Sequence, residues 1–358
     1  MQIWCKSAWR RYTRKKIFTN YTNYGIIKLV RYLIDKLNFI KIFKRRNVMR
    51  WPTLSILLLL IIFCMMILTM TACSSRNYET NIHDVNEEFN NISIKTDTAD
   101  IAFVLSDDGT CRVVCYEDAK KSHSVEVQNG TLTVNVVNDK KWYDYIGVNI
   151  DSPKITVYLP ESEYSSLIIE ESTGDIEISK DFEFKSIDIS LSTGDVKCYA
   201  SSATAIKIVA STGDIYAESI SASSLDLTVS TGKVTVSNVT CDADISIGLS
   251  TGKAYLTDIV CKNLTSMGST GDISLKNVIA AEKISIERST GDVTFEGSDA
   301  AELCITTDTG DVEGSLLTDK VFITKTDTGR INVPNSITGG RCEITTDTGD
   351  IKITISDG

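Results

Sequence analysis

Histidine is almost absent from this chain of 358 residues, which has only His83 and His123. Both lie in polar segments outside the long stretch 172–358, and we expect them on the surface. Histidine is the most common general acid or base at neutral pH, so the largest ordered region lacks the usual catalyst. The sequence also has no H-E-x-x-H motif, no phosphate-binding glycine loop and no G-x-S-x-G motif. We therefore expect no catalytic residue and no cofactor.

Paired cysteines are also missing, because the ten cysteines include no C-x-x-C pair and no zinc-finger spacing. Cys241 and Cys261 fall at equivalent places in successive repeats, and we place Cys304 and Cys342 at equivalent places two repeats apart. Free cysteine is commonly buried as a small apolar side chain. We interpret these four residues as fillers of the core.

Basic residues are scarce after the N-terminal end. Residues 1–50 carry fourteen Lys or Arg and a single acid, Asp35, whereas the remainder has 23 basic and 46 acidic residues. A strongly acidic domain repels polyanions. We therefore exclude nucleic acid as a partner of the main part of the protein.

The N-terminal region is typical of a membrane-targeting segment. Residues 49–75 include the run LSILLLLIIFCMMILTM, long enough for a signal peptide or a transmembrane span. The run ends in Met-Thr-Ala-Cys, which resembles a bacterial lipobox, so Cys73 is the candidate for lipidation; the alternative is an uncleaved single-span anchor. The basic residues 1–48 are either a cytoplasmic segment or the result of a mis-assigned start, with Met49 as the true start. Either anchor holds the rest of the protein on a bacterial membrane, outside the cytoplasm.

Residues 172–358 repeat a Ser/Asp-Thr-Gly turn every 19 or 20 residues. Apolar residues stand two and four places after each glycine and seven and five places before the next, the period-two pattern of half-buried strands. Ser or Asp opens a turn through its side-chain oxygen, and Gly adopts positive φ without steric cost. Because the units are too short for a helical crossover, they predict an all-β fold, a parallel β-helix or solenoid of about ten rungs stacked about 4.8 Å apart. The turn glycines are Gly174, Gly194, Gly213, Gly232, Gly252, Gly271, Gly291, Gly310, Gly329 and Gly349.

The residues before the repeats have a different pattern. Residues 76–91 are polar and predict a linker from the membrane. Residues 92–171 contain strand-like runs of other spacings, and Thr98-Ala99-Asp100 resembles a decayed copy of the repeat turn. Because a terminal unit of a solenoid must cover an otherwise open end, we predict that 92–171 form an N-terminal β cap.

Carboxylates gather along one edge of the last repeats. Asp308, Asp327 and Asp347 replace Ser two places before the glycine, and Asp311 and Asp350 directly follow a glycine. Calcium prefers such hard oxygen ligands, so these five residues are candidates for a weak metal site. The alternative is local capping of the turns, which is common for Asp.

The chain ends with IKITISDG directly after the last repeat turn. An unpaired edge strand is a template for another strand. This C-terminal end of the solenoid is therefore a candidate surface for self-association.

The segment KITVYLPESEYSSLIIEESTGDIEI, residues 154–178, resembles the bacterial envelope family labelled "putative adhesin", whose function is not established. The shared pattern is a strand ending in Leu-Pro, a short spacer and Gly-Asp-apolar repeats, and the resemblance covers about 92–358. It implies a membrane-anchored, adhesin-like binding or structural module of the envelope that recognises an unidentified surface ligand.

Two other functions stay open. Some relatives look like accessories of envelope-stress systems, so an accessory or sensor protein is the alternative. Some parallel solenoids are polysaccharide-active enzymes, which makes such an enzyme the second alternative. Their clefts are usually walled by long loops inserted between rungs, and units of at most 20 residues leave no material for walls. We therefore expect a protein that is not an enzyme.

Overall fold

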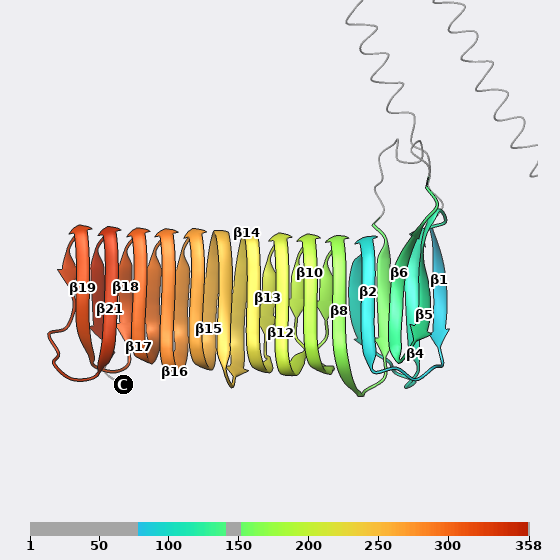
Figure 1. Cartoon of the computed structure of the whole chain (residues 1–358), viewed down its shortest axis with the longest axis horizontal. Coiled ribbons are helices and arrows are strands. Elements are labelled where there is room, and N and C mark those ends of the chain that lie inside the picture. The colour runs from blue at the N-terminus through green and yellow to red at the C-terminus, as the bar shows by residue number, and fades with distance from the viewer. Residues whose placement is uncertain (1–77, 141–151, 357–358) are drawn as a thin grey trace, which may run out of the picture. The chain divides into compact units, whose positions relative to one another are not determined.

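The computed structural model describes residues 78–140 and 152–356. Every regular element within these ranges is a β-strand, and the strands coil into an elongated solenoid (Figure 1). The predicted all-β solenoid is confirmed. In this part of the chain no helix is long and apolar enough to cross a bilayer. The predicted basic segment 1–48, membrane segment 49–75 and lipidation site Cys73 lie outside the described residues.

The strands fall into a cap and a repeat region. The cap and first rung contain β1 (Tyr78–Val85), β2 (Asn91–Thr98), β3 (Asp100–Leu105), β4 (Cys111–Asp118), β5 (Lys121–Gln128), β6 (Thr131–Asn138) and β7 (Lys154–Leu159). The repeats contain β8 (Glu163–Thr173), β9 (Ile176–Ile178), β10 (Glu183–Thr193), β11 (Val196–Cys198), β12 (Ser201–Thr212), β13 (Ile215–Glu218), β14 (Ser221–Cys241), β15 (Asp244–Thr270), β16 (Ile273–Thr290), β17 (Val293–Thr309), β18 (Val312–Leu316), β19 (Lys320–Thr328), β20 (Ile331–Asn332), β21 (Gly340–Thr348) and β22 (Ile351–Ile355). Strands β14 to β17 are long because they run on through the corners between faces.

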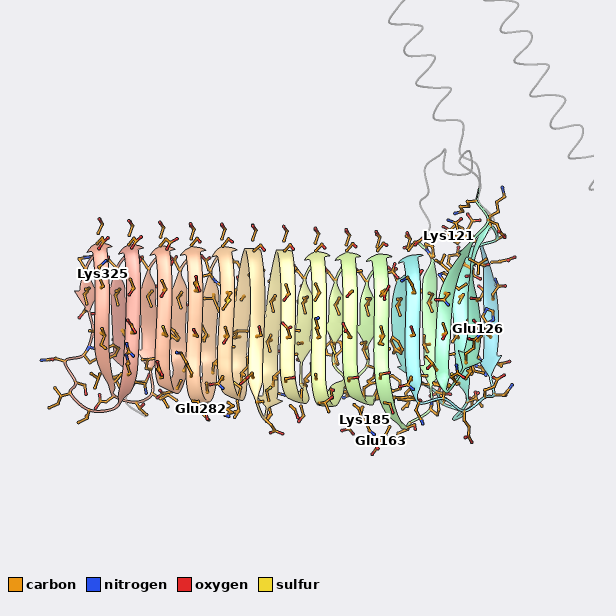
Figure 2. All side chains as sticks on the ribbon, viewed as in Figure 1. Lys121, Glu126, Glu163, Lys185, Glu282 and Lys325 are labelled. Atoms are coloured by element: carbon orange, nitrogen blue, oxygen red, sulfur yellow. The ribbon has the colours of Figure 1, made fainter. Side chains whose placement is uncertain are left out.

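Alternation along the strands builds the core. In β14 and β15, Val234, Val236, Ile245 and Ile247 point inward and are at most 1% exposed, while Thr235 between the two valines is half-buried on the outside. The same inward positions of neighbouring rungs pair in parallel register, so the aliphatic residues form one continuous cluster along the solenoid. Apolar burial of this kind contributes about 25 cal/mol per Å². Charged side chains project from the outside (Figure 2).

The repeat glycines are required by close approach as well as by φ. At Gly213 φ is 135°, and a Cβ there would lie 1.9 Å from the carbonyl oxygen of Gly194 in the preceding rung. The Gly213 N–H donates to the carbonyl of Thr231 in the following rung at 3.0 Å. Backbones of adjacent rungs therefore touch at this corner, and no side chain fits between them.

The first rung precedes the regular repeats. Strands β2 and β3 pair in parallel with β8 and β9, and Ala99 stands in the glycine column beside Gly174, as the decayed turn suggested. On their other side β2 and β3 pair in parallel with β6 and β7. Beyond these, β5 pairs antiparallel with β6, and β4 pairs antiparallel with both β7 and β1.

The prediction of a linker over residues 76–91 is wrong for Tyr78–Val85, which form β1 against β4. The polar composition of β1 is misleading because this edge strand is covered on one face only. Its outward residue Ile82 is 60% exposed, whereas Asn81 and Val85 on the other face are half-buried.

The last two rungs stack in the reverse of their sequence order. Strand β21 lies between β17 and β19 (Figure 1). In the same way, β22 lies between β18 and β20. The C-terminal strands are therefore inside the stack, and β19 and β20 form its open end. The prediction that the final IKITISDG segment forms the unpaired edge is wrong. Every rung offers the same backbone N–H and C=O groups for pairing, so a repeat that comes later in the sequence can lie between two earlier ones.

A buried ion pair joins β19 to β17 across the inserted strand β21. Lys320 of β19 is 2% exposed, and its Nζ lies 2.5 Å from Asp299 Oδ1 of β17 although β21 separates the two strands. The residue of β21 beside Lys320 is Gly340, where a Cβ would lie 2.1 Å from the carbonyl oxygen of Ala301. The missing side chain at residue 340 leaves room for the lysine to reach across the inserted strand.

Candidate functional site

The residues after the glycines form an aspartate ladder along one corner. The N–H of Asp195 donates to Asp175 Oδ1 at 2.9 Å, and the N–H of Asp214 donates to Asp195 Oδ1 at 2.8 Å. Each carboxylate thus binds the equivalent residue of the next rung and is not the local turn cap that the sequence suggested. Hydrogen bonds to ionised acceptors are stronger than neutral ones, so the ladder fixes the register of the stack.

Lys233 and Lys253 interrupt this ladder in the middle of the solenoid. Lys233 Nζ lies 3.3 Å from Asp214 Oδ2, and Lys253 Nζ lies 2.9 Å from Asp272 Oδ2. In each case the hydrogen bond to the aspartate, followed by its charge, raises the lysine pKa. The two lysines offset the acidic residues on either side of them.

Two tyrosines lie on the outward face beside these lysines. Tyr216, Thr235 and Tyr255 are successive partners in the parallel ladder, and Tyr255 is 40% exposed. Lys233 Nζ lies 6.0 Å from the centroid of the Tyr216 ring, within reach of a cation–π contact. We call Tyr216, Lys233, Thr235, Lys253 and Tyr255 the tyrosine patch. It combines aromatic, hydroxyl and cationic groups on an open sheet.

Two hollows of about 480 and 680 Å³ lie on the surface of the described residues. The smaller is lined by outward side chains around β17 and β18, including Glu296 and Lys352. The larger lies over the first rungs and includes Lys95 and Glu170. No loop inserted between rungs walls either of them.

The five aspartates proposed as weak metal ligands lie in the last rungs. Asp311 Oδ1 accepts the N–H of Asp350 at 2.7 Å, so it belongs to the ladder. Asp350 in turn accepts hydrogen bonds from the guanidinium and, to a lesser extent, the backbone N–H of Arg330, and these lower the pKa of Asp350. The remaining three are exposed at the corner: Asp308, Asp347 and Asp327. Structural hydrogen bonds account for two of the five, and the weak cation site stays a prediction.

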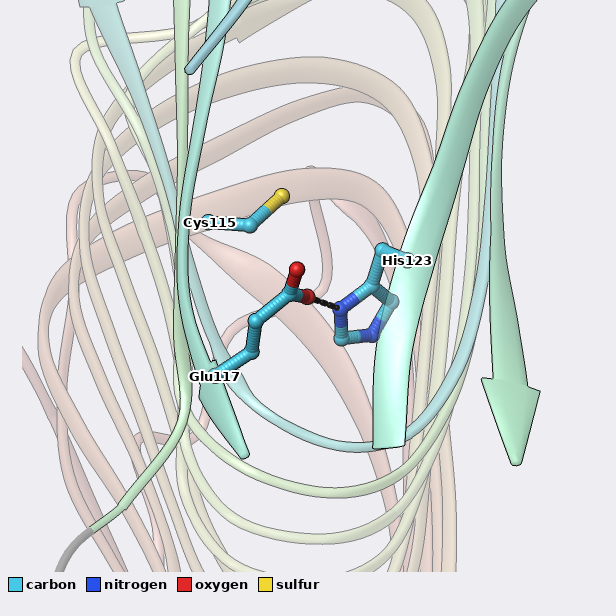
Figure 3. A group of neighbouring side chains, drawn as sticks. All are labelled: Cys115, Glu117 and His123. Carbon is cyan, nitrogen blue, oxygen red and sulfur yellow. Dashed lines mark hydrogen bonds and ion pairs between the residues drawn. The ribbon is translucent and has the colours of Figure 1, made fainter. Parts of the chain in front are cut away.

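A group of three side chains of the types that can bind metal is buried in the cap. The donor atoms of Cys115 and Glu117 on β4 and of His123 on β5 lie within 4.8 Å of one another (Figure 3). Cys115 and Glu117 are 0% exposed and His123 is 5% exposed. His123 Nδ1 lies 2.7 Å from Glu117 Oε2, and His123 Nε2 lies 2.8 Å from Thr96 Oγ1. Asn81 Nδ2 donates to Glu117 Oε1 at 2.7 Å.

The prediction of two surface histidines is therefore wrong for His123. His83 on β1 is half-buried, and its Nε2 is buried without a hydrogen-bond partner. Polar neighbours hide the buried position in the sequence. Period-two alternation along β5 places His123 on the same side as Val125 and Val127, and that pattern could have revealed it.

Glu171 extends the buried polar residues into the first repeat. It pairs in register with Thr96 and is 5% exposed. Its Oε1 accepts the N–H groups of Ala99 at 3.3 Å and Thr173 at 3.2 Å, whereas its Oε2 is buried without a partner. Burial raises the pKa of Glu171 to about 7, although the two hydrogen bonds oppose the rise.

The seven cysteines within the described residues are free thiols. Cys241 and Cys261 point inward and are 3% exposed, as predicted. The equivalence of Cys304 and Cys342 is wrong, because Cys342 pairs with Leu303. A shift of one residue moves a side chain to the other face of a strand, so Cys342 is buried and Cys304 lies on the outside.

The model of the Toastrack DUF4097 family matches residues 89–248 and 242–358. The chain belongs to this family. The family resemblance found in residues 154–178 is confirmed by this match. No curated protein matches the chain.

Three solved structures illustrate the likeness of this Toastrack protein to others. A "putative adhesin" from Bacteroides fragilis is 17% identical, covers 78% of this chain and 98% of its own, and has a TM-score of 0.37. A "putative lipid binding protein" from Parabacteroides distasonis is 12% identical over 78% of this chain and 98% of its own, with a TM-score of 0.30. A "putative cell adhesion protein" from Clostridium sporogenes is 10% identical over 78% of this chain and 100% of its own, with a TM-score of 0.23.

Proposed function

We propose that this Toastrack protein is a non-catalytic, adhesin-like binding module of the bacterial envelope. Residues 49–75, or lipidated Cys73, would tether it to the membrane outside the cytoplasm. One observation carries the proposal: the described solenoid presents long unbroken sheet faces and no cleft walled by inserted loops. Such a surface suits an extended ligand that contacts several rungs, whereas catalysis needs a site that surrounds the reacting atoms.

The tyrosine patch is the part of this surface best suited to binding. Tyrosine offers a rigid apolar ring with a polar tip, a combination enriched at binding surfaces. Lys233 and Lys253 locally offset the acidic corner, so an acidic or hydroxyl-rich polymer can approach here. We propose that an extended envelope polysaccharide lies across the patch.

Co-sedimentation of the purified full-length protein with insoluble peptidoglycan tests this function. Replacing Tyr216 and Tyr255 by alanine should weaken binding by about tenfold or more, the loss typical of a central aromatic contact. Tyr116→Ala is the matched control, because this tyrosine of the cap is also 38% exposed. Equal binding by all three proteins would contradict the proposed face.

The tether and the alternative sensor role have their own measurements. The intact mass of the mature protein should correspond to a chain that begins at a diacylglyceryl-modified Cys73; a mass that retains residues upstream of Cys73 would contradict cleavage. Deleting residues 1–48 should leave binding unchanged in a tethered binding module. A loss of function on this deletion would favour an accessory of envelope-stress signalling instead.

The open end is a further proposed contact, with a second copy of the chain as its occupant. Strands β19 and β20 each pair on one side only. The outward residues Val321 and Ile323 are 37% and 48% exposed, and Ile331, which pairs with buried Ile351, is 46% exposed because no strand covers β20. At the opposite end the strands are antiparallel, so the parallel stack cannot continue there. Two open ends that pair around a two-fold axis leave no free open end, so the assembly stops at a dimer. Light scattering should show a dimer that Ile323→Lys converts to a monomer. A wild-type monomer at high concentration would exclude this contact.

A further inference from the structure

The cluster in the cap has the composition of a transition-metal site. Cys115 Sγ, a Glu117 carboxylate oxygen and a His123 ring nitrogen lie within 4.8 Å of one another. Thiolate, carboxylate and imidazole are the three protein donors that bind zinc. The residues come from two antiparallel strands, with Cys115 and Glu117 on the same face of β4 and His123 reaching toward Glu117 from β5 (Figure 3).

The surroundings of the cluster orient these donors. His123 directs Nδ1 at Glu117, while its Nε2 is held by Thr96 Oγ1 at 2.8 Å. Asn81 Nδ2 holds the other oxygen of Glu117 at 2.7 Å. Metal-binding histidines and carboxylates usually have such an outer partner, which fixes the ring orientation and the tautomer. We propose that Cys115, Glu117 and His123 bind one zinc ion, with Thr96 and Asn81 as positioning residues.

The charges favour a divalent ion in this buried place. Glu117 as carboxylate and Cys115 as thiolate carry two negative charges, so a bound Zn²⁺ leaves the group electrically neutral. Charge that is buried without compensation is costly, and a neutral assembly avoids that cost. On binding, the Cys115 thiol releases its proton to solvent, His123 coordinates through an unprotonated nitrogen, and the Glu117–His123 hydrogen bond is replaced. The ion would link β4 to β5 and stabilise the cap.

Cobalt substitution of the purified full-length protein, after removal of metal with a chelator, tests the site. One equivalent of Co²⁺ should give visible ligand-field bands and a near-ultraviolet thiolate-to-cobalt band. Cys115→Ser should abolish the thiolate band, and Glu117→Gln, which keeps the size of the side chain, should weaken affinity. Thr96→Val should lower affinity about 10- to 100-fold, as expected for an outer partner. Cys111→Ser is the matched control, because Cys111 is another inward cysteine of β4 and is 8% exposed.

The outcomes separate a built site from incidental binding. Loss of the thiolate band in Cys115→Ser but not in Cys111→Ser supports the site, as does a rise in melting temperature with Zn²⁺ that is confined to proteins with Cys115 and His123. The chain also contains Cys5, Cys64 and Cys73, so binding that survives unchanged in Cys115→Ser and His123→Ala would be adventitious and would overturn the proposal. Failure to bind one equivalent of Co²⁺ or Zn²⁺ would overturn it equally.

Discussion

Replacing Glu171 by glutamine should make the stability of the solenoid less sensitive to pH. This carboxyl is 5% exposed, and one of its oxygens is buried without a hydrogen-bond partner. Burial raises its pKa to about 7 from the ordinary value of 4.5 that it has in the unfolded chain. The folded protein holds the proton on Glu171 more tightly than the unfolded chain does. The stability that this protonated carboxyl contributes is complete below about pH 4.5 and is lost as the pH rises to about 7.

The magnitude follows from the two pKa values. One pKa unit corresponds to about 1.4 kcal/mol, so ionisation of Glu171 should cost the folded state about 3 kcal/mol above pH 7. Glutamine is neutral at every pH and keeps an acceptor for the N–H groups of Ala99 and Thr173. The buried NH₂ group of the glutamine lowers the free energy of unfolding by an amount that does not depend on pH. The informative quantity is therefore how the difference in this free energy between the variant and the wild type changes with pH.

Urea unfolding followed by circular dichroism between pH 4 and pH 8 measures this difference. The free energy of unfolding of Glu171→Gln relative to wild type should rise by about 3 kcal/mol across the range. Glu170→Gln is the matched control, since Glu170 is exposed and its ion pair with Lys95 contributes at most about 1 kcal/mol. A difference for Glu171→Gln that stays constant with pH would refute the raised pKa.

Three other substitutions test the architecture by the same unfolding measurement. Gly213→Ala should destabilise by about 2 kcal/mol or more, because it combines a strained φ with a contact of 1.9 Å to the Gly194 carbonyl; a neutral effect would mean that the rungs can separate. Lys320→Met should lower the free energy of unfolding by about 3–5 kcal/mol, because it leaves Asp299 buried without its cation. The double variant with Asp299→Leu should regain most of this stability. A double variant as unstable as the single one would contradict the ion pair. Asp195→Ala should lower the free energy of unfolding by about 1–2 kcal/mol, because it removes the hydrogen bond to the next rung. An unchanged free energy of unfolding would contradict a stabilising role of the aspartate ladder.

Much of the solenoid could be predicted because its information is local and repeated. The glycine spacing and the alternation around Val234 and Val236 specify a rung, and identical rungs bury one another. For the aspartates that follow most of the repeat glycines, the sequence suggested either capping of their own turn or a weak cation site. Their true partner is the N–H of the next rung, as at Asp195 and Asp214, because stacking brings together groups that are 19 residues apart in the chain.

The candidate site in the cap could not be predicted by the same reasoning. Cys115, Glu117 and His123 match no spacing motif, and they converge only because β4 and β5 both face the interior of the cap. His123 also lies between two serines, so composition alone placed it on the surface. Burial of a polar group depends on which strands cover it, and that is a property of the assembled sheet.

The sequence alone determined the length of each rung, its glycine corner and which side chains point inward, because these depend on backbone sterics and on a period of two. The tertiary structure decided the order of the last two rungs and the grouping of polar residues in the cap. Repeats with the same ladder of N–H and C=O groups are interchangeable as neighbours. The observed order brings together distant residues, such as Lys320 and Asp299 across Gly340, and no local pattern encodes these contacts.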